Sequence, residues 1–500
     1  METAPDPVAI DRAAREVVAT ETAAPASIAG PAARRPRPAA IDAALRAALF
    51  GRTIGPDHGD APMAIEGRVP DELRGTLYRN GPGHLELHGR RYRHLFEGDG
   101  VVTAIRLADG GARAACRTVD SEGLRAERAA GAMRYGYSAP WWRRLPAAIR
   151  GQRKNIANTS VMMWQGRLFA LMEAGRPTEL CPETLATLGE RDLGVIGAMF
   201  SAHPHRVDAH RTTYNVGVEY GRAPRLHVYA LPDDGAARHL GAIALPGSVM
   251  LHDVIVSERH LIAFVSPVRI SVPRALTGLG SFESLFQWRP EHGTEIVVAP
   301  LAAIDRAVRF TVPAFHTWHF ANAHDAADGT VVVDHCRYPD FASFHALTAA
   351  ATATASSAAL GGSYHRARID VARRTFTSEP VADGAWDFPR IRPGREGRVH
   401  QRAWVASGEL DTLACIDPAR GVIARYQAPV DQALTEPVVV AGASDREDDV
   451  WLLSVGHDAG RDRAFVAIFA GERLADGPVA RCFLDHHLPI TFHGVWQPAA

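Results

Sequence analysis

Four histidines share a local context that suits a common site. They are His203 in "FSAHPHRVD", His252 in "MLHDVIV", His319 in "HTWHFANAHD" and His493 in "ITFHGVW". Each lies between an apolar, strand-like stretch and a nearby small residue, Asp or Pro, which is typical of strand ends that point into a central space. Their separations of 49, 67 and 174 residues are far too long for a local motif such as HExxH. The global fold must therefore assemble any site that uses them.

Four neutral imidazoles form a donor set for a borderline divalent metal, namely zinc, copper, nickel or iron. Zinc normally takes four ligands in a structural site, and three plus a water in a catalytic one. Four histidines with positions left open suit six-coordinate Fe(II), with room for O2. The residues alone do not choose among these metals, and most of the 23 histidines must be surface or core residues.

Three acidic residues stand in unexpectedly apolar surroundings. Glu173 lies in "LFALMEAGRP", Asp387 in "GAWDFPRI" and Glu436 in "LTEPVVV". A buried carboxylate is costly unless it is paired, and a metal-binding histidine needs an acceptor for its other ring N–H. Taken singly, each could be a turn residue at a strand end. Beside four histidines, the three together favour a supporting role.

The elements that must position these residues are short strands. From about residue 60, runs such as "TTYNVGVEYG", "HLIAFVSP" and "DVWLLSVGHDAG" alternate with turn residues. Helical patterns are few, at 41–50, within 140–153 and at 341–358. Many strands without alternating helices predict a large closed all-β structure, and a β-propeller suits this length, although no internal repeat is visible. If the first and last strands share a blade, His493 reaches the central axis.

Composition sets the remaining bounds. Residues 1–40 are Ala/Pro-rich and predict a disordered tail, and we expect one domain over residues 41–500. The formal net charge of −1 gives no reason to expect a nucleic-acid partner. Five cysteines without a CxxC pair indicate a reducing compartment, so we expect a cytoplasmic protein. No apolar run approaches the roughly 18 residues that span a bilayer.

Stretches from about residue 65 to the end resemble the carotenoid cleavage oxygenase family of non-haem iron dioxygenases and their isomerase relatives. They occur in the order found in that family, and nine of them together make the resemblance specific. They are "LRGTLYRNGPG", "HLFEGDGVV", "KNIANTSVMMWQGRLFALMEAGRPTEL", "FSAHPHRVD", "LHDVIVS", "WHFANAHD", "WDFPRI", "EPVVV" followed by "EDDVWLLSVGHD", and "HHLPITFHGVW".

The resemblance implies a seven-bladed propeller with a helical and loop cap over the metal face, including insertions at about 120–155 and 267–290. It implies one Fe(II) per chain and O2 as co-substrate. The implied iron ligands and catalytic residues are His203, His252, His319 and His493. Glu173, Asp387 and Glu436 are expected to support His252, His319 and His493 respectively, which leaves His203 without a carboxylate.

One departure from the family pattern falls at Asp387, where the family has a glutamate. The side chain is one methylene shorter. Either the backbone approaches His319 more closely, or a water bridges the gap, or this histidine is held more loosely. We expect iron still to bind.

The resemblance implies insertion of O2 across a C=C bond to give two carbonyl products. Stilbenoid-cleaving relatives carry a lysine directly before the glutamate, but Met172 stands there and Lys154 is the only lysine. We therefore favour a carotenoid or apocarotenoid substrate. The alternatives are a stilbenoid dioxygenase, a polyene isomerase, and a non-catalytic propeller that binds metal or carotenoid.

A polyene substrate comes from a membrane. Trp141 and Trp142 are followed by Arg143 and Arg144, and aromatic residues beside basic ones suit a peripheral contact with the inner membrane surface. The alternative is a packed cap helix with solvated arginines. A second candidate surface is 267–288, and we expect a monomer.

Overall fold

The structure is a computed structural model that describes residues 39–197, 199–277, 279–351 and 361–499. The chain divides into a unit of Met1–Pro36, outside the described residues, and a unit of Arg37–Ala500. Of the predicted tail, only its last two residues are described, and they begin helix α2 (Ala39–Arg46).

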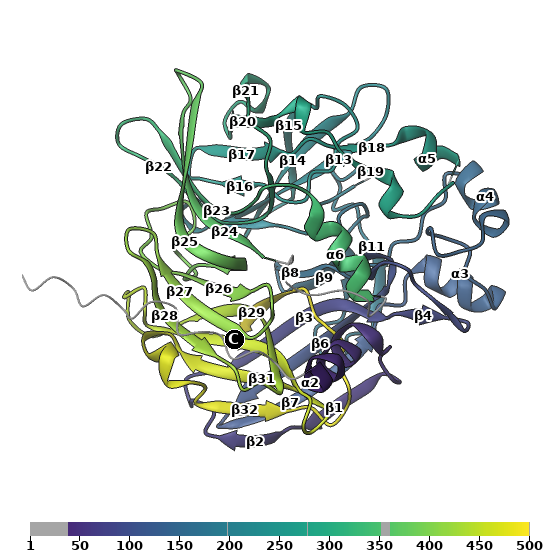
Figure 1. The fold of residues 1–500 in the computed structure, drawn as a ribbon, viewed down its shortest axis with the longest axis vertical. Coiled ribbons are helices and arrows are strands. Elements are labelled where there is room, and N and C mark those ends of the chain that lie inside the picture. Colours follow the sequence, from purple (N-terminus) through teal and green to yellow (C-terminus); the bar gives the residue numbers. More distant parts are fainter. Residues whose placement is uncertain (1–38, 198, 278, 352–360, 500) are drawn as a thin grey trace, which may run out of the picture. The chain divides into compact units, whose positions relative to one another are not determined.

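Antiparallel sheets dominate the unit of residues 37–500 (Figure 1). Within the described residues, six sheets hold four or more strands, and the one with seven strands forms two blades, so the blades number seven. These two blades meet at β25 (Thr375–Arg390), which pairs with β24 through its first part and with β26 through its last part. The prediction of an all-β propeller with seven blades is therefore confirmed.

The strands of each blade are given from the innermost outward. Blade 1 holds β33 (His493–Pro498), β3 (Gly75–His84), β6 (Asp99–Ala108), β7 (Gly111–Thr118) and β1 (His58–Pro62). Blade 2 holds β8 (Ser160–Trp164), β9 (Arg167–Leu171), β10 (Thr178–Leu180) and β11 (Thr187–Glu190). Blade 3 holds β12 (His205–Val207), β13 (Thr212–Glu219), β14 (Arg225–Pro232) and β15 (Arg238–Ala244). Blade 4 holds β16 (Ile255–Val256), β17 (His260–Val265), β20 (Thr294–Pro300) and β21 (Val308–Val312).

The last three blades follow the same order. Blade 5 holds β22 (His316–Asp325), β23 (Val331–Tyr338), β24 (Gly362–Asp370) and the first part of β25. Blade 6 holds the last part of β25, β26 (Ala403–Ser407), β27 (Thr412–Asp417) and β28 (Gly421–Gln427). Blade 7 holds β29 (Gln432–Ala441), β30 (Val450–Asp458), β31 (Arg463–Ala470), β32 (Ala480–Phe483) and β2 (Ala64–Gly67).

Apolar clusters between neighbouring blades close the ring. Leu77 of blade 1 shares a cluster with Leu453 and Val466 of blade 7, and the six other pairs of neighbours are joined in the same way. Because blades pack on both faces, β31 reads as a nearly continuous apolar run, "RAFVAIFA", and is buried along most of its length. Burial of each such Leu, Val or Phe side chain contributes about 1.5–3 kcal/mol.

Both ends of the described chain meet in two of the blades. The last strand, β33, pairs with β3, and His493 lies opposite Asn80. In the neighbouring blade β2 pairs with β32, so purple and yellow strands lie side by side in Figure 1. The expectation that early and late strands share a blade is thus met, and His493 is placed on an innermost strand.

Two hairpins and the longer helices lie outside the blades. The hairpins are β4 (Glu86–Leu87) with β5 (Arg90–Arg91) and β18 (Val268–Ile270) with β19 (Phe286–Trp288). Besides α2, the helices include π-helix η1 (Ala47–Gly51), α3 (Glu122–Ala130), α4 (Trp141–Ile149), α5 (Val272–Thr277) and α6 (Ala342–Ala351). The helices expected at 41–50 and within 140–153 are present, and the one expected at 341–358 is described as far as residue 351, with 352–360 outside the described residues. None of the described helices is both long and apolar enough to span a bilayer.

Candidate metal centre

Each blade places one of the seven predicted residues at the same central region. The blade order and the residue supplied are, from blade 1 to blade 7, His493, Glu173, His203, His252, His319, Asp387 and Glu436. His319 lies on an innermost strand, β22, and His493 begins another, β33. His203 and His252 lie in the loops that enter the innermost strands β12 and β16. Four blades therefore supply imidazoles and three supply carboxylates.

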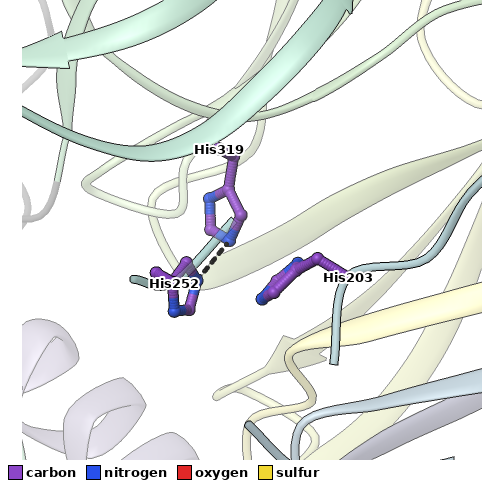
Figure 2. Close-up of side chains that lie close together, drawn as sticks. All are labelled: His203, His252 and His319. Carbon is purple, nitrogen blue, oxygen red and sulfur yellow. Dashed lines mark hydrogen bonds between the residues drawn. The ribbon is translucent and has the colours of Figure 1, made fainter. Parts of the chain in front are cut away.

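The four imidazole rings converge (Figure 2 draws three of them). Ring centroids of His203 lie 4.3 Å from His252, 5.3 Å from His319 and 4.9 Å from His493. The rings of His319 and His493 are 4.8 Å apart. One ring nitrogen from each of His203, His252 and His319 can be chosen so that all three lie within 4.8 Å of one another. All four side chains are buried.

The facing nitrogens fit a bound cation. Nε2 of His252 and Nε2 of His319 lie 3.2 Å apart (Figure 2). Nδ1 of His319 donates to Asp387 and Nδ1 of His252 lies against Glu173. These carboxylates favour the tautomer with the proton on Nδ1, in which both Nε2 atoms present lone pairs. Two lone pairs at this distance repel, whereas nitrogen ligands at right angles on one ion, with bonds of about 2.1 Å, lie about 3 Å apart. Nε2 of His203 is buried and has no hydrogen-bond partner among the described residues, as a lone pair that faces a bound ion would be.

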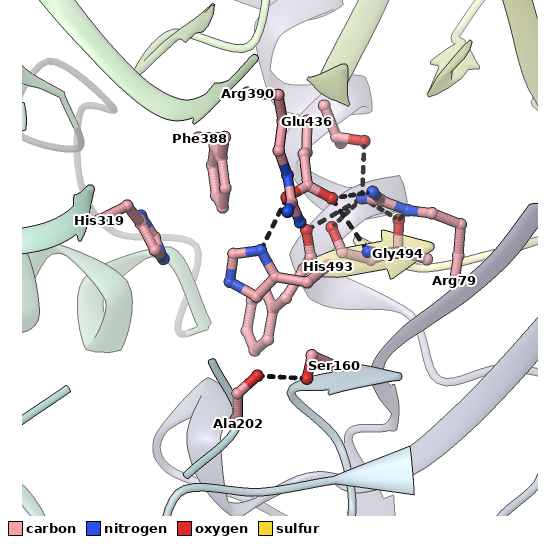
Figure 3. Close-up of polar contacts among 12 residues, drawn as sticks. Arg79, Ser160, Ala202, His319, Phe388, Arg390, Glu436, His493 and Gly494 are labelled. Carbon is pink, nitrogen blue, oxygen red and sulfur yellow. Dashed lines mark hydrogen bonds and ion pairs between the residues drawn. The ribbon is translucent and has the colours of Figure 1, made fainter. Parts of the chain in front are cut away.

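Each predicted carboxylate faces the histidine that the resemblance assigned to it. His319 donates from Nδ1 to Asp387 Oδ1 at 2.8 Å, and His493 donates from Nδ1 to Glu436 Oε1 at 2.8 Å (Figure 3). Glu173 Oε1 lies against Nδ1 of His252. Such an acceptor fixes the tautomer and the direction of the ring, and raises the basicity of the nitrogen that faces the centre.

The shorter Asp387 reaches His319 directly, so neither a bridging water nor a loose histidine is needed. The register of β25 against β26 shifts between Asp387 and Arg390, and Phe388 adopts a left-handed backbone conformation with φ of 53°. This bulge changes the path of the backbone beside His319. The carboxylate also accepts from Tyr338 Oη at 2.6 Å and from the Phe388 N–H at 2.9 Å.

No carboxylate among the described residues faces His203, and its backbone is held instead. Ser160 Oγ donates to the Ala202 carbonyl (Figure 3). The His203 N–H donates to Ser201 Oγ at 3.1 Å, and Asn215 Nδ2 donates to the Ser201 carbonyl at 2.8 Å. These contacts fix the loop that enters β12.

Two arginines that the sequence did not single out hold Glu436 (Figure 3). Buried Arg79 donates from Nη1 to Oε2, and Arg390 donates to Oε1 at 2.6 and 3.0 Å. The Gly494 N–H also donates to Oε2, at 3.0 Å. Both arginines lie in family stretches, "LYRNGPG" and "WDFPRI", but an arginine in a strand gives no sign that it is buried until its partner is known.

The electrostatics favour the neutral, metal-binding form in His203 and His493, whereas His319 is shifted the other way. Burial, together with the neighbouring imidazoles, lowers the pKa of His203 well below its ordinary value. Burial lowers the pKa of His493 to about 4 despite the Glu436 carboxylate. Burial also acts to lower the pKa of His319, but the charge of Asp387 and its hydrogen bond outweigh it and raise that pKa. The pKa of Glu436 is lowered against the effect of burial, chiefly by Arg390, His493 and Arg79.

Aromatic rings line the surroundings of the histidines. The Phe388 ring stacks on His319 with centroids 5.2 Å apart, and Trp318 packs edge-on against His252 at 4.7 Å. Beyond Trp318, a group of rings connects the site to α6 and the cap: Phe96, Phe282, Phe286, Phe341 and Phe344. Such walls repel charged solutes and suit a flat apolar one.

The two cap segments carry exposed apolar side chains. Trp141, Trp142 and Ile149 of α4 are 55%, 60% and 77% exposed, and line a shallow groove. In the second segment Val272 and Leu279 are 45% and 56% exposed. We expected Arg144 to share the membrane contact with these residues, but its guanidinium carbon packs 4.8 Å from the centroid of the Tyr137 ring. Arg143, by contrast, is exposed.

Comparison with known proteins identifies the relatives. The family model described as retinal pigment epithelial membrane protein (RPE65) matches residues 55–498. Apocarotenoid-15,15'-oxygenase of Synechocystis sp. is 29% identical over 458 residues, covering 86% of this chain and 92% of that protein. Isoeugenol monooxygenase of Pseudomonas nitroreducens is 25% identical over 461 residues, covering 87% and 94%. The crystal structure of cobalt-substituted Synechocystis apocarotenoid oxygenase matches with a TM-score of 0.81 at 28% identity, over 92% of this chain and 99% of that one.

A seven-bladed propeller and named oxygenases among the relatives define the class as an oxygenase enzyme. Because the family model spans most of the sequence, the chain belongs to the RPE65/carotenoid cleavage oxygenase family. The family predicted from the sequence is thus confirmed, as are the fold and the enzyme class.

Proposed function

We propose that this chain is an Fe(II)-dependent dioxygenase that cleaves a C=C bond of a carotenoid or apocarotenoid with O2 to give two aldehydes. One Fe(II) per chain is held by His203, His252, His319 and His493. The observation that carries this proposal is that the Nε2 atoms of His252 and His319 face each other 3.2 Å apart. Beside them lies the Nε2 of His203, which has no hydrogen-bond partner among the described residues. A relative that accepts cobalt in a crystal supports a divalent metal at this position.

The residues of this chain have defined tasks in that reaction. When bound, Fe(II) supplies open coordination positions at which O2 can be activated. Glu173, Asp387 and Glu436 hold three imidazoles in the ligand tautomer and aim them at the centre. Phe388 and Trp318 exclude water and offer flat apolar faces along which a polyene can lie. No external reductant is required, because both oxygen atoms end in the products.

The choice of polyene over phenol rests on two side chains. Lys154, the only lysine, is committed elsewhere, because its Nζ lies 2.6 Å from Asp99 Oδ1 and 2.7 Å from Glu127 Oε2. Met172, which directly precedes Glu173, brings its sulfur to 3.3 Å from the Ile156 N–H. An apolar thioether suits a polyene better than a phenolate.

The test is reconstitution of the apo-protein with Fe(II) under anaerobic conditions, followed by addition of O2 and substrate. We expect one iron per chain, aldehydes from an apocarotenal, and ¹⁸O from ¹⁸O2 in both carbonyl products. Exposed His345, 59% exposed, provides the control variant His345→Ala, which should behave as the wild type. Activity on resveratrol or isoeugenol alone would refute the substrate choice. An isomerised product without ¹⁸O would indicate an isomerase. Bound iron without any product would indicate a non-catalytic protein.

We also infer that α4 and the 267–288 segment dock on the inner surface of the membrane, from which the cytoplasmic monomer draws its substrate. The exposed rings of Trp141 and Trp142, beside Arg143, suit an interface of anionic headgroups and acyl chains. Co-sedimentation with vesicles of phosphatidylcholine and phosphatidylglycerol tests this. Trp142→Ala should reduce binding, whereas Leu188→Ala, which removes a side chain 51% exposed on blade 2, should not; equal effects would refute the assignment.

A further inference from the structure

Asp253, the residue after His252, makes more contacts than a neighbouring loop residue needs. Its side chain is buried. Oδ1 accepts from His205 Nε2 at 2.7 Å and from the Val254 N–H at 2.7 Å. Oδ2 accepts from the Phe320 N–H at 3.2 Å. Both oxygens of one carboxylate are therefore engaged by groups from three separate segments.

Those three segments are the ones that carry the clustered histidines. His205 lies two residues after His203, in blade 3. Phe320 directly follows His319 on β22, in blade 5. Asp253 itself stands in blade 4, at the entry to β16, between the other two. One buried carboxylate thus links three consecutive blades, through contacts that lie within two residues of His203, His252 and His319.

We propose that Asp253 and His205 are positioning residues that set the spacing of the His203, His252 and His319 nitrogens and thereby the metal affinity of the site. This inference rests on the proposed function. Within the part of the chain that the structure describes, His203 is the one ligand that faces no carboxylate, so its ring direction depends on how its backbone is held. The bond from His205 to Asp253 is the lateral link that fixes this backbone against the segment of His252.

The chain offers a matched control at the other end of the same blades. His260 Nδ1 bonds to Asp325 Oδ1 at 2.6 Å, and this carboxylate also accepts a backbone N–H, from Arg259 at 3.0 Å. The side-chain exposures agree closely: 21% and 2% for His205 and Asp253, and 20% and 8% for His260 and Asp325. Asp325 ends β22, whereas the cluster lies near its start. Removing this pair has a similar structural cost but leaves the ligand loops untouched.

The experiment is a titration of the apo-protein with Co(II), followed by its visible absorption, with the urea midpoint of the apo-protein measured in parallel. His205→Ala and Asp253→Asn should weaken Co(II) binding by about 10- to 100-fold, the usual effect of losing a partner that orients a metal ligand. His205→Gln retains an N–H donor and should restore most of the affinity. His260→Ala should bind Co(II) as the wild type does.

The outcomes separate this inference from the proposed function. If the wild type does not bind Co(II) stoichiometrically, the metal centre itself is refuted. If the wild type binds but His205→Ala titrates identically, or if His205→Ala and His260→Ala weaken binding equally, the positioning role is refuted while the metal centre stands.

Discussion

Neutralising Glu436 should destabilise the protein far more than neutralising a surface carboxylate in an equally short ion pair. The Glu436 side chain is 1% exposed and that of its partner Arg79 is not exposed at all. In Glu436→Gln the guanidinium stays buried, because it also donates to Thr491 Oγ1 at 3.0 Å and to the Phe492 carbonyl at 3.0 Å. A buried charge left without its counterion costs about 3–5 kcal/mol.

The control for this prediction is Asp71→Asn. Asp71 pairs with Arg68 at 2.6 Å, but the two side chains are 63% and 81% exposed, so the loss should stay below about 1 kcal/mol. Urea unfolding of both variants at neutral pH, followed by tryptophan fluorescence, measures the difference. Because the pKa of Glu436 is lowered in the folded state, its contribution is complete above the ordinary glutamate pKa and is lost as the pH falls through the folded value. The cost of Glu436→Gln should therefore be the same at about pH 6 and about pH 8.

A small loss in Glu436→Gln, no larger than in Asp71→Asn, would refute the reasoning, since it would mean that Arg79 finds water or another anion. The stability measurement is made on the apo-protein so that it does not depend on the metal. A Co(II) titration of the same variant reports the second consequence, a weaker hold on the His493 ring.

Three further predictions concern single side chains. His252→Ala should abolish both metal binding and O2 uptake, measured by metal analysis and an oxygen electrode, and retention of stoichiometric iron would contradict its role as a ligand. The sequence predicts that Asp387→Glu leaves activity intact or raises it. Because Asp387 already bonds to His319 at 2.8 Å, the added methylene should cost about 1–3 kcal/mol of unfolding free energy. An unchanged urea midpoint would show that the bulge relaxes to accept the longer side chain. Burial and the nearby charge of Asp208 raise the pKa of Glu396 to about 7, so the contribution of Glu396 to stability falls as the pH rises from about 4.5 to about 7. Glu396→Gln should then be more stable than the wild type at about pH 8, by up to about 3 kcal/mol, and no difference between their urea midpoints at that pH would contradict the raised pKa.

The propeller could be predicted from the residues because its strands are short, apolar and separated by turn residues. The number of blades could not be predicted in this way, because no repeat is visible in the sequence, and it came from the family resemblance instead. The junction at β25 shows why: one strand of Thr375–Arg390 serves two blades, and it is interrupted by Pro380 and Gly384. A prediction from strand length and turn residues would divide β25 into separate strands at Pro380 and Gly384.

The residues of the site differed in how easily they could be found. A histidine or carboxylate in apolar surroundings is conspicuous, because burial of such a group needs a partner. Arg79 and Asp253 lie in equally apolar stretches, yet their partners are far away in the sequence; Arg79 bonds to a residue 357 positions later. The sequence shows that such a charge exists, whereas only the packed blades show which group compensates it.

The number of blades explains why His203 is supported differently from the other histidines. Seven blades, each supplying one of these residues to the central region, give four imidazoles and leave three positions for carboxylates. Blades 2, 6 and 7 supply these to His252, His319 and His493, so no blade remains for His203. Its support comes from within blade 3, through the Ser201 contacts, and from the two sides, through Ser160 of blade 2 and the bond of His205 to Asp253 of blade 4. The bond between His205 and Asp253 couples His203 to His252, and the bond from the Phe320 N–H to Asp253 adds His319. A change at Asp253 should therefore disturb these three ligands together, whereas a change at Glu436 should disturb His493 alone.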